Sequence, residues 1–159
     1  MPVTIRPIRP EDAGIEQEFV RNLSVESRYF RFMDTVRELS PRMLAHFTQV
    51  DYERHMALIA VTAHKGREVQ IAVARYVADE EGQRCEFAIV VADAWQQKGL
   101  GTRLLQALIG AARATGLRVM HGEVLAANHR MLALMSQLGF SAHFDERDPR
   151  TMRVELNLQ

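Results

Sequence analysis

The sequence predicts an α/β (α+β) domain in which helices cover both faces of a mixed sheet. Three strand patterns lie close together and are separated by short turns, as in antiparallel hairpins, whereas a helical pattern separates the next two strands. A strand–helix–strand connection makes parallel neighbours, so the sheet must be mixed. Each helical pattern has one apolar face that has to be buried against a sheet. The 159 residues, 47% of them hydrophobic, indicate a single domain with its own core, residues 1–159.

Residues 3–8 predict a short first strand, because apolar and polar side chains alternate there until Pro7 and Pro10 interrupt the pattern. Three helical segments follow. The third has the clearest start, since Ser40 can cap the free N–H groups and Pro41 suits the first helical position. The expected helices are residues 11–19, residues 24–32 and the stretch that begins at Ser40.

The middle of the chain predicts three strands joined by two hairpin turns. Residues 64–67 and 79–82 each contain a glycine among polar residues, which is typical of turns. The stretches beside them are apolar or alternate between apolar and polar residues. The expected strands are residues 56–62, residues 69 to about 78, and residues 84–91.

The last third predicts an alternation of helices and strands. Residues 99–114 place leucines on one helical face, and Gly116 is positioned to end that helix. Asn128 is positioned to start another helix, and Gly139 to stop it. Each helix connects one strand to the next, so we expect parallel neighbours at these crossovers. The expected strands are residues 117–125, a short strand opened by Phe140, and residues 152–158.

The composition argues against several classes of function. The formal net charge is zero, so no overall field would attract nucleic acid or an anionic membrane, and neither is expected as a partner. Cys85 is the only cysteine, which excludes an internal disulfide, and the first residues contain no long apolar stretch. Both observations favour a cytoplasmic protein. The six histidines show no metal-ligand spacing, so no metal is expected.

The most informative stretch is Gln-Gln-Lys-Gly-Leu-Gly-Thr, residues 96–102. It follows the strand at residues 84–91 and opens the helix at residues 99–114. Its glycines let the backbone approach a ligand closely, and the free N–H groups of the first helical turn attract an anion such as a phosphate. The spacing Gln-x-x-Gly-x-Gly matches neither the dinucleotide-binding fingerprint nor the nucleoside-triphosphatase loop.

This spacing resembles the pyrophosphate loop of the GNAT acetyltransferase superfamily, which grips coenzyme A. The resemblance implies the GNAT fold across nearly the whole chain, with a mostly antiparallel sheet of six or seven strands that is splayed between strands four and five. The opening strand and the Asn-led helix with its Gly-Phe turn are also similar to that family, at residues 5–13, 128–132 and 138–140.

Three further segments narrow the resemblance. They are similar to the acetyltransferase domain of the bacterial protein lysine acetyltransferases that modify acetyl-CoA synthetase. This similarity implies that the acceptor is a lysine of a protein. The segments are residues 24–32, 38–41 and 85–88.

The resemblance assigns acetyl-CoA to the end of the fourth strand. The pantetheine arm would lie along the strand end, where a backbone N–H near Val90 or Val91 would polarise the thioester carbonyl. Asn128 would contact pantetheine, although it is equally suited to cap its helix and could do both. The residues expected to bind acetyl-CoA are Ile89, Val90, Val91, Gln96, Gln97, Lys98, Gly99, Leu100, Gly101, Thr102 and Asn128.

Acetyl transfer to a lysine requires a base, because the ammonium has a pKa of about 10.4. Glu86 is the only charged residue within an apolar strand, and we expect it to be buried there. Burial raises the pKa of a carboxyl group toward a value that suits a general base, and the resemblance implies the same catalytic role. The alternatives are an edge glutamate in solvent, or one paired with Arg84 or Arg75.

Other polar residues near this strand have two interpretations each. Cys85 would face away from Glu86, because side chains alternate along a strand, which argues against an acyl-cysteine intermediate. His121 and Glu123 share one face of the fifth strand and would either relay protons or form ordinary hydrogen bonds in the sheet.

No general acid is assigned to protonate the coenzyme A thiolate. Met135 stands where many family members have a tyrosine, and a thiol with a pKa of about 8.5 leaves as thiolate without help.

The acceptor is less well defined than the donor. Arg28, Tyr29 and Arg31 would shape its recognition, or their helix would simply bury aromatic residues and leave the arginines in solvent. The expected function is acetyl-CoA-dependent N-acetyl transfer to a primary amine, in first place a protein lysine. The alternatives are a small amine (polyamine, amino acid or antibiotic) as acceptor, and a non-catalytic acyl-CoA sensor. A monomer and a homodimer both remain open.

Overall fold

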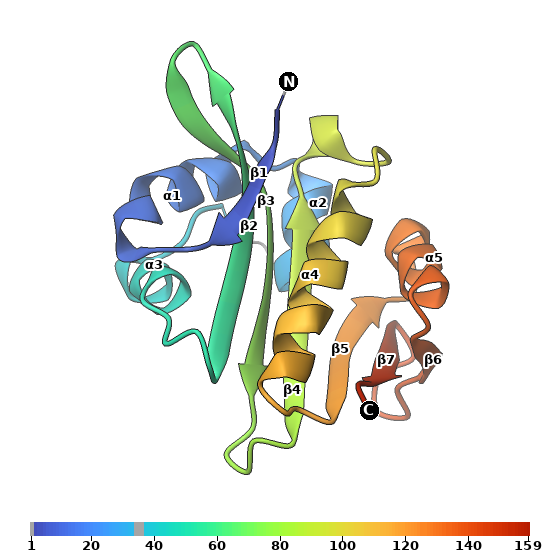
Figure 1. The fold of residues 1–159 in the computed structure, drawn as a ribbon. Coiled ribbons are helices and arrows are strands. Elements are labelled where there is room, and N and C mark those ends of the chain that lie inside the picture. Colours follow the sequence, from blue (N-terminus) through green and yellow to red (C-terminus); the bar gives the residue numbers. More distant parts are fainter. Residues whose placement is uncertain (1, 34–36) are drawn as a thin grey trace.

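The computed structural model describes residues 2–33 and 37–159, which form one seven-stranded sheet with helices on both sides (Figure 1). The strand order across the sheet is β1-β2-β3-β4-β5-β7-β6, which confirms the expected number of strands. The strands are β1 (Thr4–Pro7), β2 (His55–His64), β3 (Arg67–Ala78), β4 (Arg84–Val91), β5 (Val119–Leu125), β6 (Ser141–Phe144) and β7 (Thr151–Asn157).

The second and third helices begin where they were expected, whereas the first starts at Ala13 after a 3-10 turn and continues to Asn22 instead of ending at Phe19. The Ser24 hydroxyl accepts a hydrogen bond from Ser27 N at 3.0 Å, and the Ser40 hydroxyl accepts one from Met43 N at 3.2 Å. Both serines therefore satisfy an N–H that has no partner within its helix. The helices are α1 (Ala13–Asn22), α2 (Val25–Phe32), α3 (Pro41–Thr48), α4 (Leu100–Ala114) and α5 (His129–Gln137), with 3-10 turns at Pro10–Asp12 and Asp93–Trp95.

β2, β3 and β4 form an antiparallel meander, as the two hairpin turns predict, and β1 pairs antiparallel with β2 after a connection of three helices. β4 and β5 then run parallel, but they stay together only briefly. The last register pair that joins them is Glu86 with His121. Within the described residues no pairing continues past this point, although β4 runs on to Val91 and β5 to Leu125. The splay expected between the fourth and fifth strands is confirmed, and it opens a gap in the sheet.

The prediction of parallel neighbours was wrong at the second crossover. α5 leads from β5 to β6, but β7 lies between these two strands and pairs antiparallel with both. The chain passes over to the sheet edge and then returns as a hairpin, so the free side of β5 is filled by the later strand. Among the described residues β4 and β5 are the one parallel pair.

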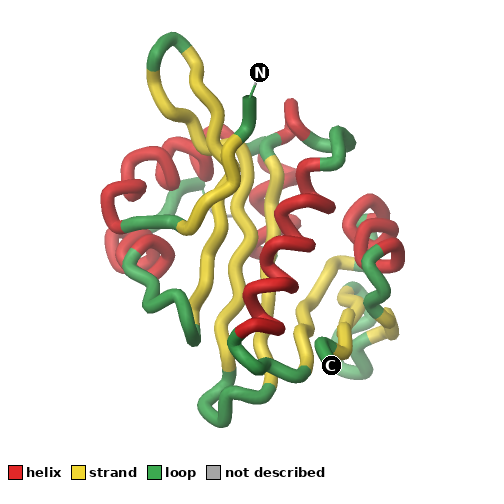
Figure 2. Tube along the Cα trace, viewed as in Figure 1, coloured by secondary structure: helices red, strands yellow, loops and turns green. Residues whose placement is uncertain are grey.

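Two apolar clusters hold the layers together, and the tube view shows helices in front of and behind the sheet (Figure 2). One cluster joins the sheet to α4 and α5, and the other joins it to α1, α2 and α3. Successive residues of β4 divide between them, since Phe87 and Ile89 belong to the first cluster and Val90 to the second. The expected cover on both faces is therefore confirmed.

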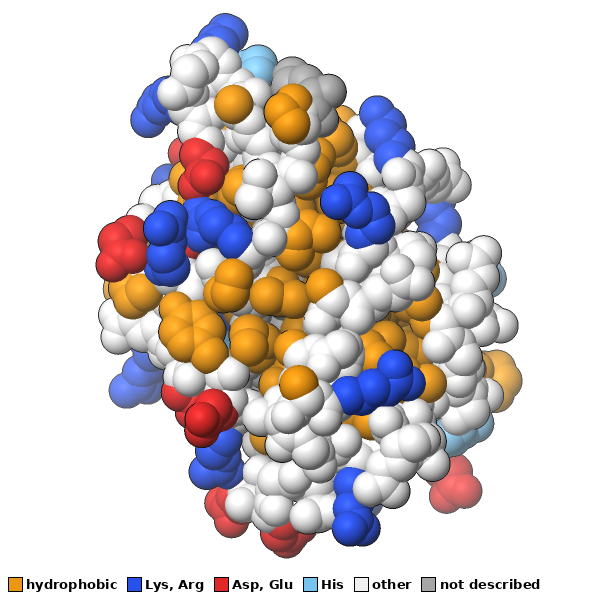
Figure 3. Space-filling model, viewed as in Figure 1, with side chains coloured by type: hydrophobic (Ala, Val, Ile, Leu, Met, Phe, Trp, Pro, Cys, Tyr) orange, Lys and Arg blue, Asp and Glu red, His pale blue; other side chains and the backbone are white. Residues whose placement is uncertain are grey.

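The surface carries charges of both signs. On the face shown in Figure 3, arginine and lysine side chains are interspersed with acidic ones around an apolar middle. This mixture agrees with the net charge of zero. In the part of the chain that the structure describes, no helix is both long and apolar enough to cross a membrane.

Candidate active site

The loop between β4 and α4 exposes backbone N–H groups. Gln97 has a φ of 60° and Gly99 a φ of 81°, so the chain enters the left-handed region twice before α4 starts at Leu100. This conformation costs glycine little but other residues about 1–2 kcal/mol. The first hydrogen bond of α4 runs from Arg103 N to Gly99 O at 3.2 Å. The N–H groups ahead of Arg103 have no partner within the helix and can bind an anion.

A cavity of about 890 Å³, called the large cavity below, occupies the gap between β4 and β5. The loop, the ends of both strands, α2 and the start of α5 form its walls. Of the residues expected to bind acetyl-CoA, the following line it: Ile89, Val90, Val91, Gln96, Gln97, Gly99, Gly101, Thr102 and Asn128.

Two residues expected at this site lie outside the lining of the large cavity. The Leu100 side chain is buried in the apolar cluster under α4, because the first turn of the helix points it at the sheet. Lys98 is exposed, and its ammonium lies 5.6 Å from the centre of the Trp95 ring. Only the backbone of Leu100 can therefore face a bound anion, whereas Lys98 is placed at the rim.

The backbone N–H and C=O of Val91 face the gap between the splayed strands. Its carbonyl accepts a hydrogen bond from Gln96 Nε2 at 3.0 Å, whereas the next amide, that of Ala92, donates to Ile71 of β3 at 2.8 Å. In a β-strand the N–H and C=O of one residue point to the same side, and those of the next residue point to the opposite side. The N–H of Val91 therefore points into the gap together with its carbonyl. This distinguishes Val91 from Val90, whose backbone N–H and C=O face β3.

Gln96 and Asn128 organise the mouth of the large cavity. Gln96 holds the loop against β4 through its bond to Val91, and its Oε1 accepts a hydrogen bond from Arg130 at 3.2 Å. Asn128 Oδ1 accepts a hydrogen bond from Met131 N at 3.3 Å, so it does cap α5. Asn128 also lines the large cavity, so capping and ligand contact are compatible.

Sequence reasoning missed several residues of the large cavity. α2 contributes Ser27 and Phe30, the end of the second 3-10 turn contributes Trp95, and α5 contributes Arg130. These residues lie on separate elements and form no motif along the chain. Arg130 alone had a usable signal, because a residue two places after the Asn128 cap must lie in the first turn of the helix.

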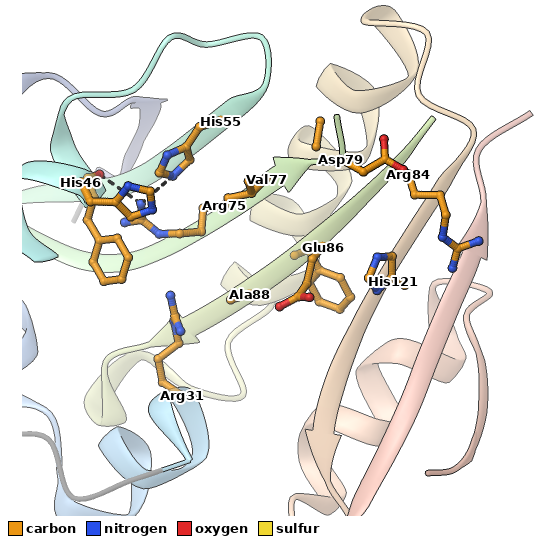
Figure 4. A pocket seen from close by; sticks show the side chains of 13 residues that line it. Arg31, His46, His55, Arg75, Val77, Asp79, Arg84, Glu86, Ala88 and His121 are labelled. Atoms are coloured by element: carbon orange, nitrogen blue, oxygen red, sulfur yellow. Dashed lines mark hydrogen bonds between the residues drawn. The ribbon is translucent and has the colours of Figure 1, made fainter. Parts of the chain in front are cut away.

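A second cavity of about 470 Å³, called the small cavity below, lies on the sheet face that carries Glu86 (Figure 4). Arg31, Phe87 and Ala88 line both cavities, so the two spaces meet at β4. The small cavity is rich in titratable side chains, which are Arg31, His46, His55, Arg75, Asp79, Arg84, Glu86 and His121.

The expectation that Glu86 is buried was wrong: its side chain is exposed. The strand is covered by α4 on its other face, but on this face β5 diverges and leaves the small cavity open. The proposed pairings with arginine are not formed either. Arg84 bonds Glu155 at 2.7 Å, and Arg75 bonds Glu16 at 2.8 Å. The carboxylate thus remains available to a molecule that enters the small cavity, which agrees with the alternative of a solvated glutamate.

Arg75, which lines the small cavity, belongs to a buried ion pair with Glu16. Glu16 accepts hydrogen bonds from Arg75 at 2.8 Å and from Gln70 at 2.9 Å. Arg75 also lies over the Phe47 ring, 4.3 Å from its centre, and contacts His55 Nε2 at 3.1 Å. Burial, followed by the charge of Arg75, lowers the pKa of His55 to about 4, so this imidazole is neutral at physiological pH.

Cys85 and Glu86 face opposite sides of the sheet, as the strand alternation predicts. Cys85 is fully buried under α4, and burial raises the pKa of its thiol to about 12. A thiol in this state is a poor nucleophile at neutral pH.

On the face of the sheet that carries Glu86, burial and the charge of Arg84 lower the pKa of His121 below its usual 6.5. Among the described residues, no group of three His, Cys, Asp or Glu side chains is placed to hold a metal ion.

The three residues expected to recognise the acceptor have separate positions. Arg31 is half-buried between the two cavities, where burial and the charge of Arg75 lower its pKa to about 10. Arg28 donates to the carbonyl of Arg21 at 3.1 Å, and Tyr29 is exposed; neither lines the large or the small cavity. Of these three residues, Arg31 is thus the one that reaches the site, and the simpler interpretation does not describe Tyr29 either, because its ring is not buried.

Comparisons with known proteins agree with this geometry. The acetyltransferase (GNAT) domain family matches residues 3–141. An acetyltransferase of Pseudomonas aeruginosa is 38% identical over 147 residues, which are 92% of this chain and 77% of that protein. The acetyltransferase Pat of Mycolicibacterium smegmatis is 31% identical over 85% of this chain, which spans only 40% of that relative's length. The GNAT domain of S. lividans PAT has a TM-score of 0.87 at 29% identity, with 98% of this chain and 90% of that chain covered.

Proposed function

This chain belongs to the GNAT acetyltransferase family, which uses acetyl-CoA, and from that premise we propose that it acetylates a protein lysine with Glu86 as general base. The observation that carries the proposal is the junction of the two cavities at Phe87 and Ala88 of β4. The large cavity has the anion-binding loop, and the small cavity has an accessible carboxylate. A thioester in the first would meet an amine in the second beside the same strand.

The donor fits the large cavity by charge and by direction. The pyrophosphate would rest on the N–H groups at the start of α4, where the helix dipole adds to the attraction. The pantetheine arm would run along the splayed end of β4. The N–H of Val91 points into this gap and would donate to the thioester oxygen as the carbonyl becomes tetrahedral. Asn128 and Gln96 would border the arm on either side.

The acceptor would enter through the small cavity. Glu86 is exposed there, so it can take a proton from a lysine ammonium directly or through a water. The neutral amine would then attack the carbonyl, and the thiolate of coenzyme A would leave. Support for a protein acceptor comes from the resemblance at residues 24–32 and 85–88. The Glu86 carboxylate would have no purpose in a sensor that only binds acyl-CoA.

The test is a thiol-release assay with acetyl-CoA, run against a panel of small amines and against lysate proteins, followed by mass spectrometry of the products. The proposal expects acetylated protein lysines and little acetylation of the small amines. Glu86→Gln should lower the rate by about 10²-fold or more while acetyl-CoA still binds. Glu81→Gln, in the exposed turn after β3, is the matched control and should behave as wild type.

Three results would contradict the proposal. A Glu86→Gln variant with the wild-type rate would exclude this residue as the base. Acetylation of small amines in preference to every protein would replace the lysine acceptor by a small-amine substrate. Binding of acetyl-CoA without release of thiol from any acceptor would instead favour a sensor.

A further inference from the structure

Glu86 and His121 form the final register pair of the only parallel strand junction in the described sheet. Residues that are paired in this way project from the same face. Both side chains line the small cavity, and Figure 4 shows them beside each other across the two strands. The strands diverge immediately beyond this pair, so both side chains stand at the edge of the space where an acceptor would meet the donor.

The chemistry requires more than one proton to leave the acceptor. An ammonium loses its first proton before attack and a second one from the tetrahedral intermediate, when the C–N bond has formed and the C–S bond breaks. Glu86 can hold only one proton at a time. A second acceptor next to it would clear the first proton before the second is released.

The surroundings of His121 suit such a role. On one side it faces Glu86 and Arg84 of β4, and on the other it faces Arg153 and Glu155 of β7. Arg84 and Arg153 share Glu155, at 2.7 Å and 3.8 Å, so that carboxylate is already committed. Burial and Arg84 hold the pKa of the imidazole below 6.5, which leaves it neutral and able to accept a proton near pH 7.

We propose that His121 is the second proton acceptor of this site, which takes the proton from Glu86 and passes it to water. The inference rests on the proposed function of Glu86. The two protons that the acceptor loses, one before attack and one from the tetrahedral intermediate, leave along this route, directly or through a water in the small cavity. The coenzyme A thiolate departs with the electron pair of the C–S bond and takes up one proton from water, so one proton is released overall.

The first test measures kcat and KM against pH with acetyl-CoA and, as the acceptor, a lysine-containing peptide taken from a protein that is acetylated in the thiol-release assay. His121→Gln should lower kcat by about 10²-fold and leave the KM for acetyl-CoA unchanged. It should also remove the acid limb of the wild-type profile, in which activity falls as His121 becomes protonated below pH 6.5. Added imidazole should restore part of the rate to His121→Ala. His64→Gln, on the remote β2–β3 hairpin, should match wild type.

A second measurement needs no turnover. The titration of the His121 ring is followed by NMR in wild type and in Glu86→Gln. Because a carboxylate favours the imidazolium, its loss should lower the pKa of His121 further. An unchanged titration would overturn the proposal, as would a His121→Gln variant with the wild-type rate and pH profile. If Glu86→Gln stays active, the proposed base is wrong and the relay falls with it. If Glu86→Gln is inactive while His121→Gln is not, only the relay is overturned.

Discussion

The ring of Phe87 in β4 occupies the space in which a side chain on Gly122 of β5 would lie. A Cβ at Gly122 would be 2.7 Å from the nearest ring carbon, which is closer than real Cβ atoms approach. Phe87 in turn packs against Phe140 and lines both cavities. The glycine therefore lets an aromatic side chain fill the base of the gap where the two strands separate.

Gly122→Ala should destabilise the protein by about 1–3 kcal/mol, because the added methyl group forces the Phe87 ring or the strand to move. Urea denaturation of both proteins measures this change in the free energy of unfolding. Gly110→Ala is the matched control, since its Cβ would meet no atom within 4 Å on the exposed side of α4. That substitution should stabilise the helix by about 0.5–1 kcal/mol. Equal stability of the two variants would mean that the ring moves aside at no cost.

Gly99→Val should weaken the binding of coenzyme A by about tenfold or more, a change of about 1.4 kcal/mol. The side chain would crowd the anion that rests on the start of α4. Both Gly99 and Gly116 have positive φ values, of 81° and 86°, at opposite ends of this helix. Gly116→Val therefore suffers similar backbone strain without a change at the cavity. Isothermal titration should find wild-type affinity for Gly116→Val; an unaltered affinity in Gly99→Val would refute the loop assignment.

Glu16→Gln should destabilise the protein by about 3–5 kcal/mol, because it leaves the charge of Arg75 buried without its counter-ion. The side chains of this pair are 2% and 5% exposed. The Arg21–Glu38 pair has a comparable distance, 2.7 Å, but its side chains are more than half exposed. Glu38→Gln should therefore change the free energy of unfolding by less than about 1 kcal/mol. Similar losses in both variants would show that burial of the Glu16 pair does not matter.

Cys85 should resist alkylation by iodoacetamide at pH 8 in the folded protein. With a pKa of about 12, only about one thiol in ten thousand is ionised at this pH. Cys85→Ala should keep the wild-type rate of acetyl transfer, since the thiol faces the core and not the cavities. Mass spectrometry should detect rapid alkylation only after denaturant is added. Fast modification of the native protein, or an inactive Cys85→Ala, would reopen the acyl-cysteine route.

The expected elements were largely confirmed, because each depends on signals a few residues apart. The caps at Ser24 and Ser40 and the left-handed Gly99 are local features that the chain carries with it. The position of β7 between β5 and β6 was mispredicted for the opposite reason. A helical connection indicates that two strands run parallel, but not which later strand fills the space between them.

The sequence by itself determined the loop at which we propose that the donor binds, because the spacing of residues 96–102 after a strand fixes where the N–H groups of α4 point. Only the tertiary structure decided the surroundings of Glu86, where we propose that the acceptor binds. Whether Glu86 is buried, and whether His121 stands beside it, depends on how far β5 accompanies β4 and on which helices cover that face. Those are contacts between distant segments, and no pattern within the strand itself records them.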